Sequence, residues 1–232
     1  MKKTPATNND IVVGGLTPLT TIDYPGELSA VIFLQGCPWR CGYCHNGHLL
    51  PRADQQDLSW EQIVAFLEDR RGLLDAVVFS GGEPTLQKGL SEAIREVKEM
   101  GFKIGLHTAG IYPERFQALL PLLDWVGLDI KASMSDYEKI TGVPGSGKRA
   151  WQSAEILIKS GVDHEIRTTV HPDLIDEQAL IQLTMELGEL GVRNYCLQEC
   201  ITHHCLDVKL HNTFSNITAS SFLTPLSQMI SG

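Results

Sequence analysis

Short apolar runs alternate with longer amphipathic segments through most of this chain, and this alternation limits the possible folds more than any other feature. The apolar runs, rich in β-branched residues, cover residues 30–34, 76–79, 102–106, 126–130, 165–170 and 195–197. Between them, apolar residues recur with the period of a helix, as do Leu90, Ile94 and Val97. Strands that alternate with helices pair in parallel, so the sequence predicts an α/β fold of six βα units.

Local signals mark where the helices begin and end. Ser59 and Gln62 are spaced as a capping box, in which each side chain pairs with a free backbone N–H of the first turn. Gly101, Gly161 and Gly191 each close a helical stretch shortly before the next strand, because glycine readily adopts the left-handed conformation that ends a helix. We therefore expect helices to alternate with strands in regular order.

Polar or glycine-rich residues follow successive strands, for example at Gly82, Thr108, Lys131 and His171. The carboxyl ends of parallel strands meet at one rim, where α/β proteins place their chemistry. Six units are too few for a closed eight-stranded barrel. We therefore expect a partial (β/α)6 TIM-like barrel rather than an open doubly wound sheet.

The composition fits one globular domain and excludes several classes of protein. Of 232 residues, 43% are hydrophobic, and we treat residues 1–232 as a single domain with its core at about 14–198 and a Ser- and Thr-rich tail of uncertain structure at 199–232. The net charge of −9 argues against a nucleic-acid partner. No apolar run approaches the ~20 residues that span a membrane, and polar residues follow Met1, so we expect a cytoplasmic protein with reduced thiols.

Three cysteines follow the first predicted strand within one short loop. Cys37, Cys41 and Cys44 are separated by three and then two residues. Three thiolates can hold three irons of a four-iron cluster, which leaves the fourth iron open to another ligand. The alternative is a zinc site, in which His45 or His48 would complete four ligands.

The same loop resembles the signature of the radical S-adenosylmethionine (SAM) superfamily. The resemblance rests on the cysteine spacing, on Tyr43 before the last cysteine, and on Gly81, Gly82 and Glu83 followed by proline, and it spans about residues 14–198. It implies a partial barrel of six βα units, a [4Fe–4S] cluster on Cys37, Cys41 and Cys44, and SAM as the second cofactor.

Within that superfamily, the stretch at residues 21–26 and the sequence Cys44-His45-Asn46 resemble activating enzymes of glycyl radical enzymes, most of all those of anaerobic ribonucleoside-triphosphate reductase. The resemblance implies a flavodoxin or ferredoxin-type electron donor, reductive cleavage of SAM, and removal of hydrogen from a backbone glycine of the partner. One alternative is a short radical SAM enzyme acting on a small molecule, like 7-carboxy-7-deazaguanine synthase. Another is a zinc-binding or electron-carrier module.

SAM carries an amino group, a carboxylate, a ribose and an adenine, and the rim residues match these groups. Glu83 and the backbone of Gly82 suit the amino group, whereas Lys131 and Arg167 suit the carboxylate or the ribose. We expect no catalytic residue beyond the cluster and the SAM site. The predicted SAM-binding residues are Tyr43, Gly81, Gly82, Glu83, Thr108, Asp129, Lys131, Arg167 and Gln198.

Two of the charged residues predicted at the rim, Asp129 and Arg167, have a second interpretation. His107 stands where the resembling activating enzymes carry an acid, whereas Asp129 matches their second acid. A monovalent cation near Asp129 and a buried Asp129–Lys131 pair are therefore the two interpretations of this corner. Arg167 could instead pair with Glu165 or Asp163 on the outside of the sheet.

Asp23 and the late cysteines are further candidates. Asp23 is a candidate for binding the partner's loop through its backbone N–H groups, or it only helps to form a turn. Cys196, Cys200 and Cys205, with His203 and His204, either form a second metal site or are core and solvated residues.

One motif is set aside. Residues 142–148 fit part of a phosphate-binding loop, but Arg149 stands where a Ser or Thr must bind magnesium. We interpret this stretch as a flexible connection before the next helix.

Overall fold

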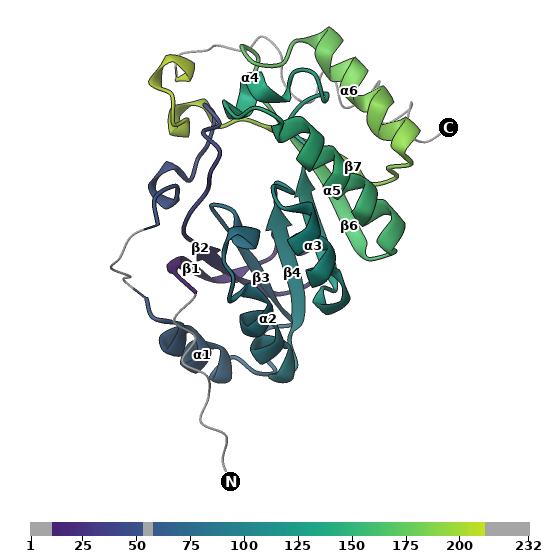
Figure 1. Cartoon of the computed structure of the whole chain (residues 1–232). Helices are drawn as coiled ribbons and strands as arrows, with labels where there is room; N and C mark the ends of the chain where they lie inside the picture. The colour runs from purple at the N-terminus through teal and green to yellow at the C-terminus, as the bar shows by residue number, and fades with distance from the viewer. Residues whose placement is uncertain (1–10, 53–57, 212–232) are drawn as a thin grey trace.

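The computed structural model describes residues 11–52 and 58–211, which form one seven-stranded sheet with helices packed against it (Figure 1). The strands lie in chain order, β1 to β7. Their bounds are β1 Val13–Thr20, β2 Ser29–Leu34, β3 Ala76–Gly81, β4 Lys103–Thr108, β5 Trp125–Asp129, β6 Asp163–Val170 and β7 Tyr195–Glu199. All neighbours from β2 to β7 are parallel, which confirms the predicted α/β fold with six parallel strands and fits a partial barrel.

The helices follow the predicted alternation. They are α1 Trp60–Glu68, α2 Leu90–Glu99, α3 Pro113–Leu119, α4 Tyr137–Thr141, α5 Ser146–Ser160 and α6 Glu177–Leu190. Right-handed crossovers between strands in sequential order place successive helices on the same face of a sheet. The other face is therefore free to curve around a site at the carboxyl ends of the strands.

The helix boundaries agree with the sequence signals. Ser59 accepts a hydrogen bond from the Gln62 backbone N–H, and the Gln62 side chain accepts one from the Ser59 N–H at 2.8 Å, which completes the capping box of α1. Gly161 and Gly191 take the left-handed conformation at the ends of α5 and α6, and Gly101 has φ +97° just after α2. These boundaries confirm the predictions made for them.

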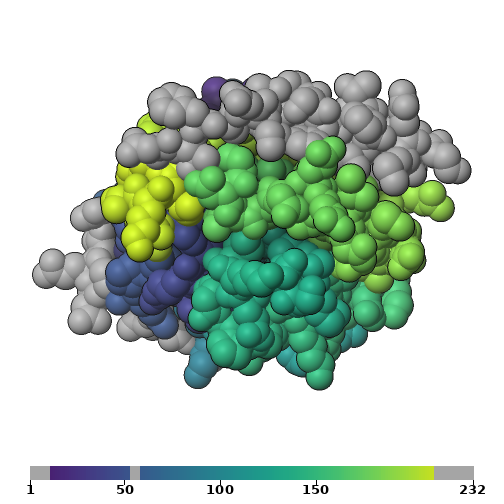
Figure 2. Space-filling model, turned by 90° about the horizontal axis from the view of Figure 1, so that it is seen from above, coloured from purple at the N-terminus to yellow at the C-terminus, as the bar shows by residue number. Residues whose placement is uncertain are grey.

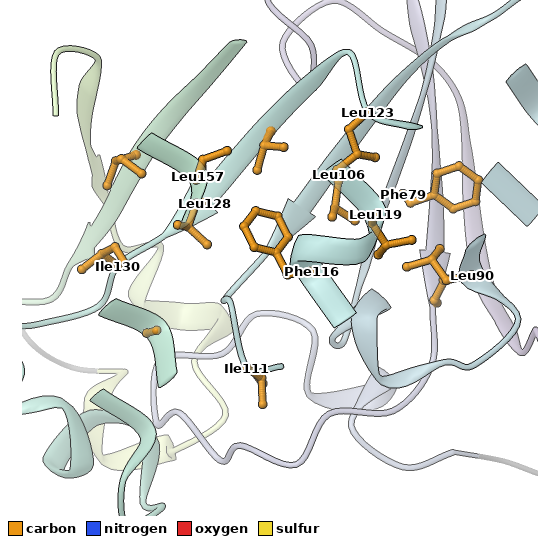
Figure 3. Packing of buried hydrophobic residues seen from close by; sticks show 14 of the residues in the cluster. Phe79, Leu90, Leu106, Ile111, Phe116, Leu119, Leu123, Leu128, Ile130 and Leu157 are labelled. Carbon is orange, nitrogen blue, oxygen red and sulfur yellow. The ribbon is translucent and has the colours of Figure 1, made fainter. Parts of the chain in front are cut away.

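The core fills the space between the sheet and its helices (Figure 3). Phe79, Leu106 and Leu128 come from β3, β4 and β5, and they are fully buried with Phe116 of α3 and Leu157 of α5. Burying one such side chain contributes about 1.5–3 kcal/mol. A continuous apolar layer of this kind holds the strand ends in fixed register.

Three features differ from the sequence-based expectations. The strand β1 was not predicted; it pairs antiparallel with β2 and extends the sheet beyond the six βα units. The short helix α4 was also missed, and α5 begins at Ser146, so the supposed flexible connection is confined to residues 142–145. Each of these segments is short or mixes polar and apolar residues, so its periodicity is weak.

The end of the described chain is folded. Residues 202–211 contain two short 3-10 turns, η4 Thr202–His204 and η5 Val208–Leu210, and the rest of the predicted tail, 212–232, lies outside the described residues. The polar N-terminal residues 1–10 lie outside them too. Among the helices described, none combines the length and the apolar character needed to cross a membrane.

Candidate active site

The three early cysteines lie in the loop after β2 and line a cavity of about 390 Å³ at the carboxyl ends of the strands. Backbone hydrogen bonds fix this loop, from Gly36 N–H to Leu49 O at 2.7 Å and from Cys44 N–H to Cys41 O at 3.0 Å. The Arg40 guanidinium also donates to the carbonyl of Cys37 at 2.6 Å. The volume is within the range of about 300–1,000 Å³ found for small-molecule sites.

The surroundings of these thiols fit metal ligands better than nucleophiles. Burial raises the pKa of Cys37 to about 12 and also raises the pKa of Cys41. A free thiol of this kind is largely protonated at neutral pH and reacts slowly. A bound metal deprotonates a thiol outright, and three soft thiols on one cavity wall suit an iron–sulfur cluster.

The glycine pair after β3 lets two loops approach closely. Gly81 has φ +124°, a conformation that side chains other than glycine rarely adopt, and Gly82 packs on the cysteine loop. A Cβ atom at Gly82 would lie 2.4 Å from the carbonyl oxygen of Gly36. The Glu83 N–H donates to that same oxygen at 2.8 Å, so the rim and the cysteine loop are joined backbone to backbone.

Glu83 is buried beneath the rim and does not line the cavity. Its carboxylate accepts hydrogen bonds from Thr85, from the Thr108 hydroxyl at 2.7 Å and from the Ala109 N–H at 3.0 Å. These bonds fix the residues after β3 and β4 relative to each other. The structure thus directs the Glu83 carboxylate into the rim, while Gly81 and Gly82 border the cavity.

Three charged side chains that line the same cavity form a network. Asp129 accepts from Arg167 Nη2 at 3.0 Å and from Arg167 Nε at 3.1 Å, and its other oxygen lies 3.7 Å from Lys131 Nζ. Burial alone would raise the pKa of Asp129, but Arg167 and Lys131 outweigh it and lower that pKa. Arg167 therefore points into the barrel, and the external pairing with Glu165 or Asp163 is not the observed one.

The Lys131 side chain of this network remains charged. Burial alone would lower the pKa of Lys131, but Tyr43 and Asp129 outweigh it and the pKa is raised. Lys131 Nζ lies 5.5 Å from the centre of the Tyr43 ring. Two cations and one carboxylate leave this wall with net positive charge, which favours an anionic ligand group.

His107 and Asp23 meet at the edge of the same cavity. His107 Nε2 donates to the backbone carbonyl of Asp23 at 2.8 Å, and the Asp23 carboxylate accepts from the Thr20 hydroxyl at 2.7 Å. Burial and the neighbouring Arg167 lower the pKa of His107 to about 4, so the imidazole is neutral at pH 7. A backbone turn from Tyr24 to Glu27 follows, so Asp23 both precedes a turn and lines the cavity.

The structure brings nearly all of the predicted site residues together. The predicted residues that line this cavity are Asp23, Cys37, Cys41, Tyr43, Cys44, Gly81, Gly82, Thr108, Asp129, Lys131, Arg167 and Gln198. Sequence reasoning missed Asn46, Ser80 and Thr169. Thr169 could have been found, because it lies two residues after Arg167 on β6 and alternation places both on one face.

Comparisons with known proteins agree with this site. The model of the radical SAM superfamily matches residues 31–183. A protein of Methanocaldococcus jannaschii named as a glycyl-radical enzyme activating enzyme is 36% identical over 198 residues, which cover 81% of this chain and 79% of that protein. The pyruvate formate-lyase-activating enzyme of Clostridium pasteurianum is 32% identical over 194 residues, again covering 81% and 79%.

Solved structures share the fold at lower sequence identity. SuiB of Streptococcus suis, solved bound to S-adenosylmethionine, superposes with a TM-score of 0.61 at 16% identity. The match covers 85% of this chain but 45% of SuiB, so the chain spans less than half of that protein. TYW1, solved with a lysine-pyruvate adduct bound, gives a TM-score of 0.57 at 15% identity, with 88% of this chain and 72% of TYW1 covered.

Site, family model and relatives agree, and the chain belongs to the radical SAM superfamily and, within it, to the glycyl-radical enzyme activating enzymes. Members of this superfamily use a [4Fe–4S] cluster and SAM, and the three thiols, the glycine rim and the cationic wall fit these groups. Family membership decides against the small-molecule enzyme and against the zinc or electron-carrier module as the main function.

Proposed function

We propose that this chain activates an anaerobic ribonucleoside-triphosphate reductase by generating a radical on a glycine of that enzyme. The observation that carries the proposal is that the three cysteine thiols, the cationic wall and Asp23 border a single cavity. The stretch at residues 21–26 and the Cys44-His45-Asn46 sequence support this choice of partner. When bound, the reduced cluster supplies the electron that cleaves SAM to methionine and a 5′-deoxyadenosyl radical, which takes hydrogen from the glycine.

The chain's own residues bind and orient the two cofactors in this proposal. Cys37, Cys41 and Cys44 would hold three irons of the cluster and would leave the fourth iron open to SAM. Lys131 and Arg167 receive the SAM carboxylate or ribose through charge-assisted hydrogen bonds, and Asp129 holds both cations in place.

The remaining wall residues position the rest of SAM. The backbone around Gly81 and Gly82 accepts the amino group, while Glu83 fixes that backbone from below. Thr108 acts mainly through Glu83, because its hydroxyl is already donated to that carboxylate at 2.7 Å. Tyr43, in the loop after β2, and Gln198, on β7, also border the cavity and complete the predicted SAM site.

Asp23 is the proposed contact to the partner's glycine loop. Asp23 borders the cavity, and the hydrogen bond from His107 to its backbone carbonyl fixes its position. An ionised carboxylate accepts stronger hydrogen bonds from backbone amides than a neutral group does. We also propose a flavodoxin or ferredoxin-type donor and a cytoplasmic location, because the thiols and the cluster require a reducing compartment.

Pyruvate formate-lyase is a second candidate partner, because relatives at 32% and 30% identity are named as its activating enzymes. The test is anaerobic electron paramagnetic resonance on wild-type protein mixed with each of the two glycyl radical enzymes from the same source. We expect a glycyl radical doublet with the reductase. A doublet with pyruvate formate-lyase alone would transfer the proposal to that partner.

The Asp23→Ala variant tests the docking role. We expect a lower yield of the glycyl radical, with uncoupled SAM cleavage close to that of the wild type, because Asp23 contacts the partner rather than SAM. An Asp23→Ala variant that activates the reductase as fast as the wild type would contradict this role.

A further inference from the structure

A second group of metal-ligating side chains lies beside the cysteine loop. His45, Cys200 and Cys205 each offer a ligand atom, and these three atoms all lie within 4.8 Å of one another. Cys200 follows β7 directly, whereas His45 follows Cys44. The fold thus brings together two segments that are 155 residues apart in sequence.

The distances in this group match a tetrahedral zinc site. Cys200 Sγ lies 3.5 Å from Cys205 Sγ and 3.6 Å from His45 Nε2. Zinc binds sulfur at about 2.3 Å and imidazole nitrogen at about 2.0–2.1 Å, so the edges of its tetrahedron are roughly 3.8 Å between two sulfurs and roughly 3.6 Å between sulfur and nitrogen. These two spacings fit ligands of one zinc ion, and the third, between Cys205 and His45, is no longer than 4.8 Å.

Both thiols are buried, and their surroundings are already ordered. Cys200 and Cys205 are 6% and 5% exposed. The Cys200 N–H donates to the Val170 carbonyl at 3.0 Å, and the His211 side chain donates to the Cys205 carbonyl at 2.7 Å. A site with its backbone fixed in advance needs little further ordering when the ion enters.

We propose that His45, Cys200 and Cys205 bind a zinc ion that fastens residues 200–211 to the cysteine loop. Each thiol releases one proton as zinc binds, so one Zn²⁺ and two thiolates form a neutral unit with the neutral imidazole. The fourth position is left for water or for His204, whose ring centre lies 6.2 Å from that of His45. Two sulfur ligands with imidazole are typical of zinc.

The segment that zinc would fasten already rests on the cysteine loop. Figure 2 shows the yellow residues near the end of the described chain against the dark blue residues of this loop. The Asp207 N–H donates to the Gly42 carbonyl at 2.8 Å, and the buried His171 donates from Nε2 to the Leu210 carbonyl at 3.1 Å. Zinc would add a metal bond from this segment to the residue next to Cys44, so it would tie the cysteine loop to residues 200–211.

Elemental analysis of the anaerobically purified full-length protein tests the proposal. We expect about one zinc ion per chain in the wild type, and on the order of tenfold less in Cys200→Ser and in Cys205→Ser. Cys196→Ser is the matched control, because Cys196 lies on β7 outside the group, and it should keep its zinc. The triple variant Cys37→Ala, Cys41→Ala, Cys44→Ala should keep it too, which separates this site from zinc bound adventitiously at the cysteine loop.

X-ray absorption at the zinc edge gives a second readout that does not depend on any variant. Two sulfur neighbours at about 2.3 Å with nitrogen or oxygen at about 2.0–2.1 Å are expected. The proposal would be overturned by a wild type without zinc, by a zinc shell without sulfur, or by equal zinc in the Cys196→Ser and Cys200→Ser proteins. An intact mass lower by two hydrogens, assigned to a Cys200–Cys205 disulfide, would also overturn it.

Discussion

The two cysteine groups lie at the same end of the sheet but are assembled in different ways. Cys37, Cys41 and Cys44 belong to one loop and line the cavity, whereas Cys200 and Cys205 meet His45 only because the chain returns after β7. The first group faces the strand ends and the charged wall. The second joins His45, which borders the same cavity, to residues 200–211, so we infer that one group supports chemistry and the other supports the loop.

Cysteine substitutions should give the largest difference in SAM cleavage between the two groups. We expect Cys37→Ala, Cys41→Ala and Cys44→Ala each to reduce SAM cleavage by dithionite-reduced protein to the background, because each thiol holds one iron of the cluster. Cys196→Ala, Cys200→Ala and Cys205→Ala should still cleave SAM, since they add no ligand at that centre. Product formation is measured by chromatography of 5′-deoxyadenosine.

Either of two results would contradict the roles assigned to the two cysteine groups. If any variant of the first group retains SAM cleavage, that cysteine is not a cluster ligand. If Cys200→Ala removes both cleavage and iron, the second group is part of the cluster site rather than a support for its loop. Iron and sulfide contents of the same samples distinguish a lost cluster from a displaced loop.

The difference between the groups also explains what the sequence could predict. The spacing of Cys37, Cys41 and Cys44 is local, so their joint role is visible before any fold is known. The parallel strands place Gly82, Thr108, Asp129 and Arg167 at one rim, and the alternation of strands and helices predicts this as well. Sequence reasoning thus found most of the cavity wall.

Contacts between distant segments were beyond that reasoning. The sequence offers His45 as a zinc ligand with the early cysteines, but its Nε2 lies 3.6 Å from Cys200 Sγ. The position of Cys200 depends on the turn after β7, which no periodic pattern specifies. In the same way, the burial of Glu83 in the rim follows from hydrogen bonds to Thr85, Thr108 and Ala109, which a motif does not reveal.

Replacing Gly82, which follows β3 and contacts the cysteine loop, should have an effect almost as large as replacing one of the three early cysteines. In Gly82→Ala the new Cβ would lie 2.4 Å from the Gly36 carbonyl oxygen, a backbone atom that cannot rotate away. Relief requires the two loops to separate, so we expect the free energy of unfolding to fall by about 1–3 kcal/mol. Weaker SAM binding should accompany it, although every cysteine is present.

Anaerobic denaturation and equilibrium binding of SAM measure these two effects. Gly188→Ala is the matched control, because nothing lies within 4 Å of a Cβ at that position of α6. A Gly82→Ala protein with wild-type stability and SAM affinity would show that the close approach of the rim and the cysteine loop is not required.

Replacing Gly47, which lies against Leu206, should have the smallest effect. In Gly47→Ala the new Cβ would lie 2.8 Å from Leu206 Cδ1, which is the far end of a flexible side chain that is 42% exposed. Leu206 can rotate toward solvent at small cost, and replacing glycine also restricts the unfolded chain, which favours the folded state. These opposing effects leave the free energy of unfolding within about 1 kcal/mol of the wild type.

Hydrogen exchange of the Asp207 N–H, which donates to the Gly42 carbonyl, reports directly on whether residues 200–211 still pack on the cysteine loop. With zinc at His45, Cys200 and Cys205 the protection should persist in Gly47→Ala and fall in Cys200→Ser; equal loss of protection in both would mean that apolar packing, rather than the metal, holds the two segments together.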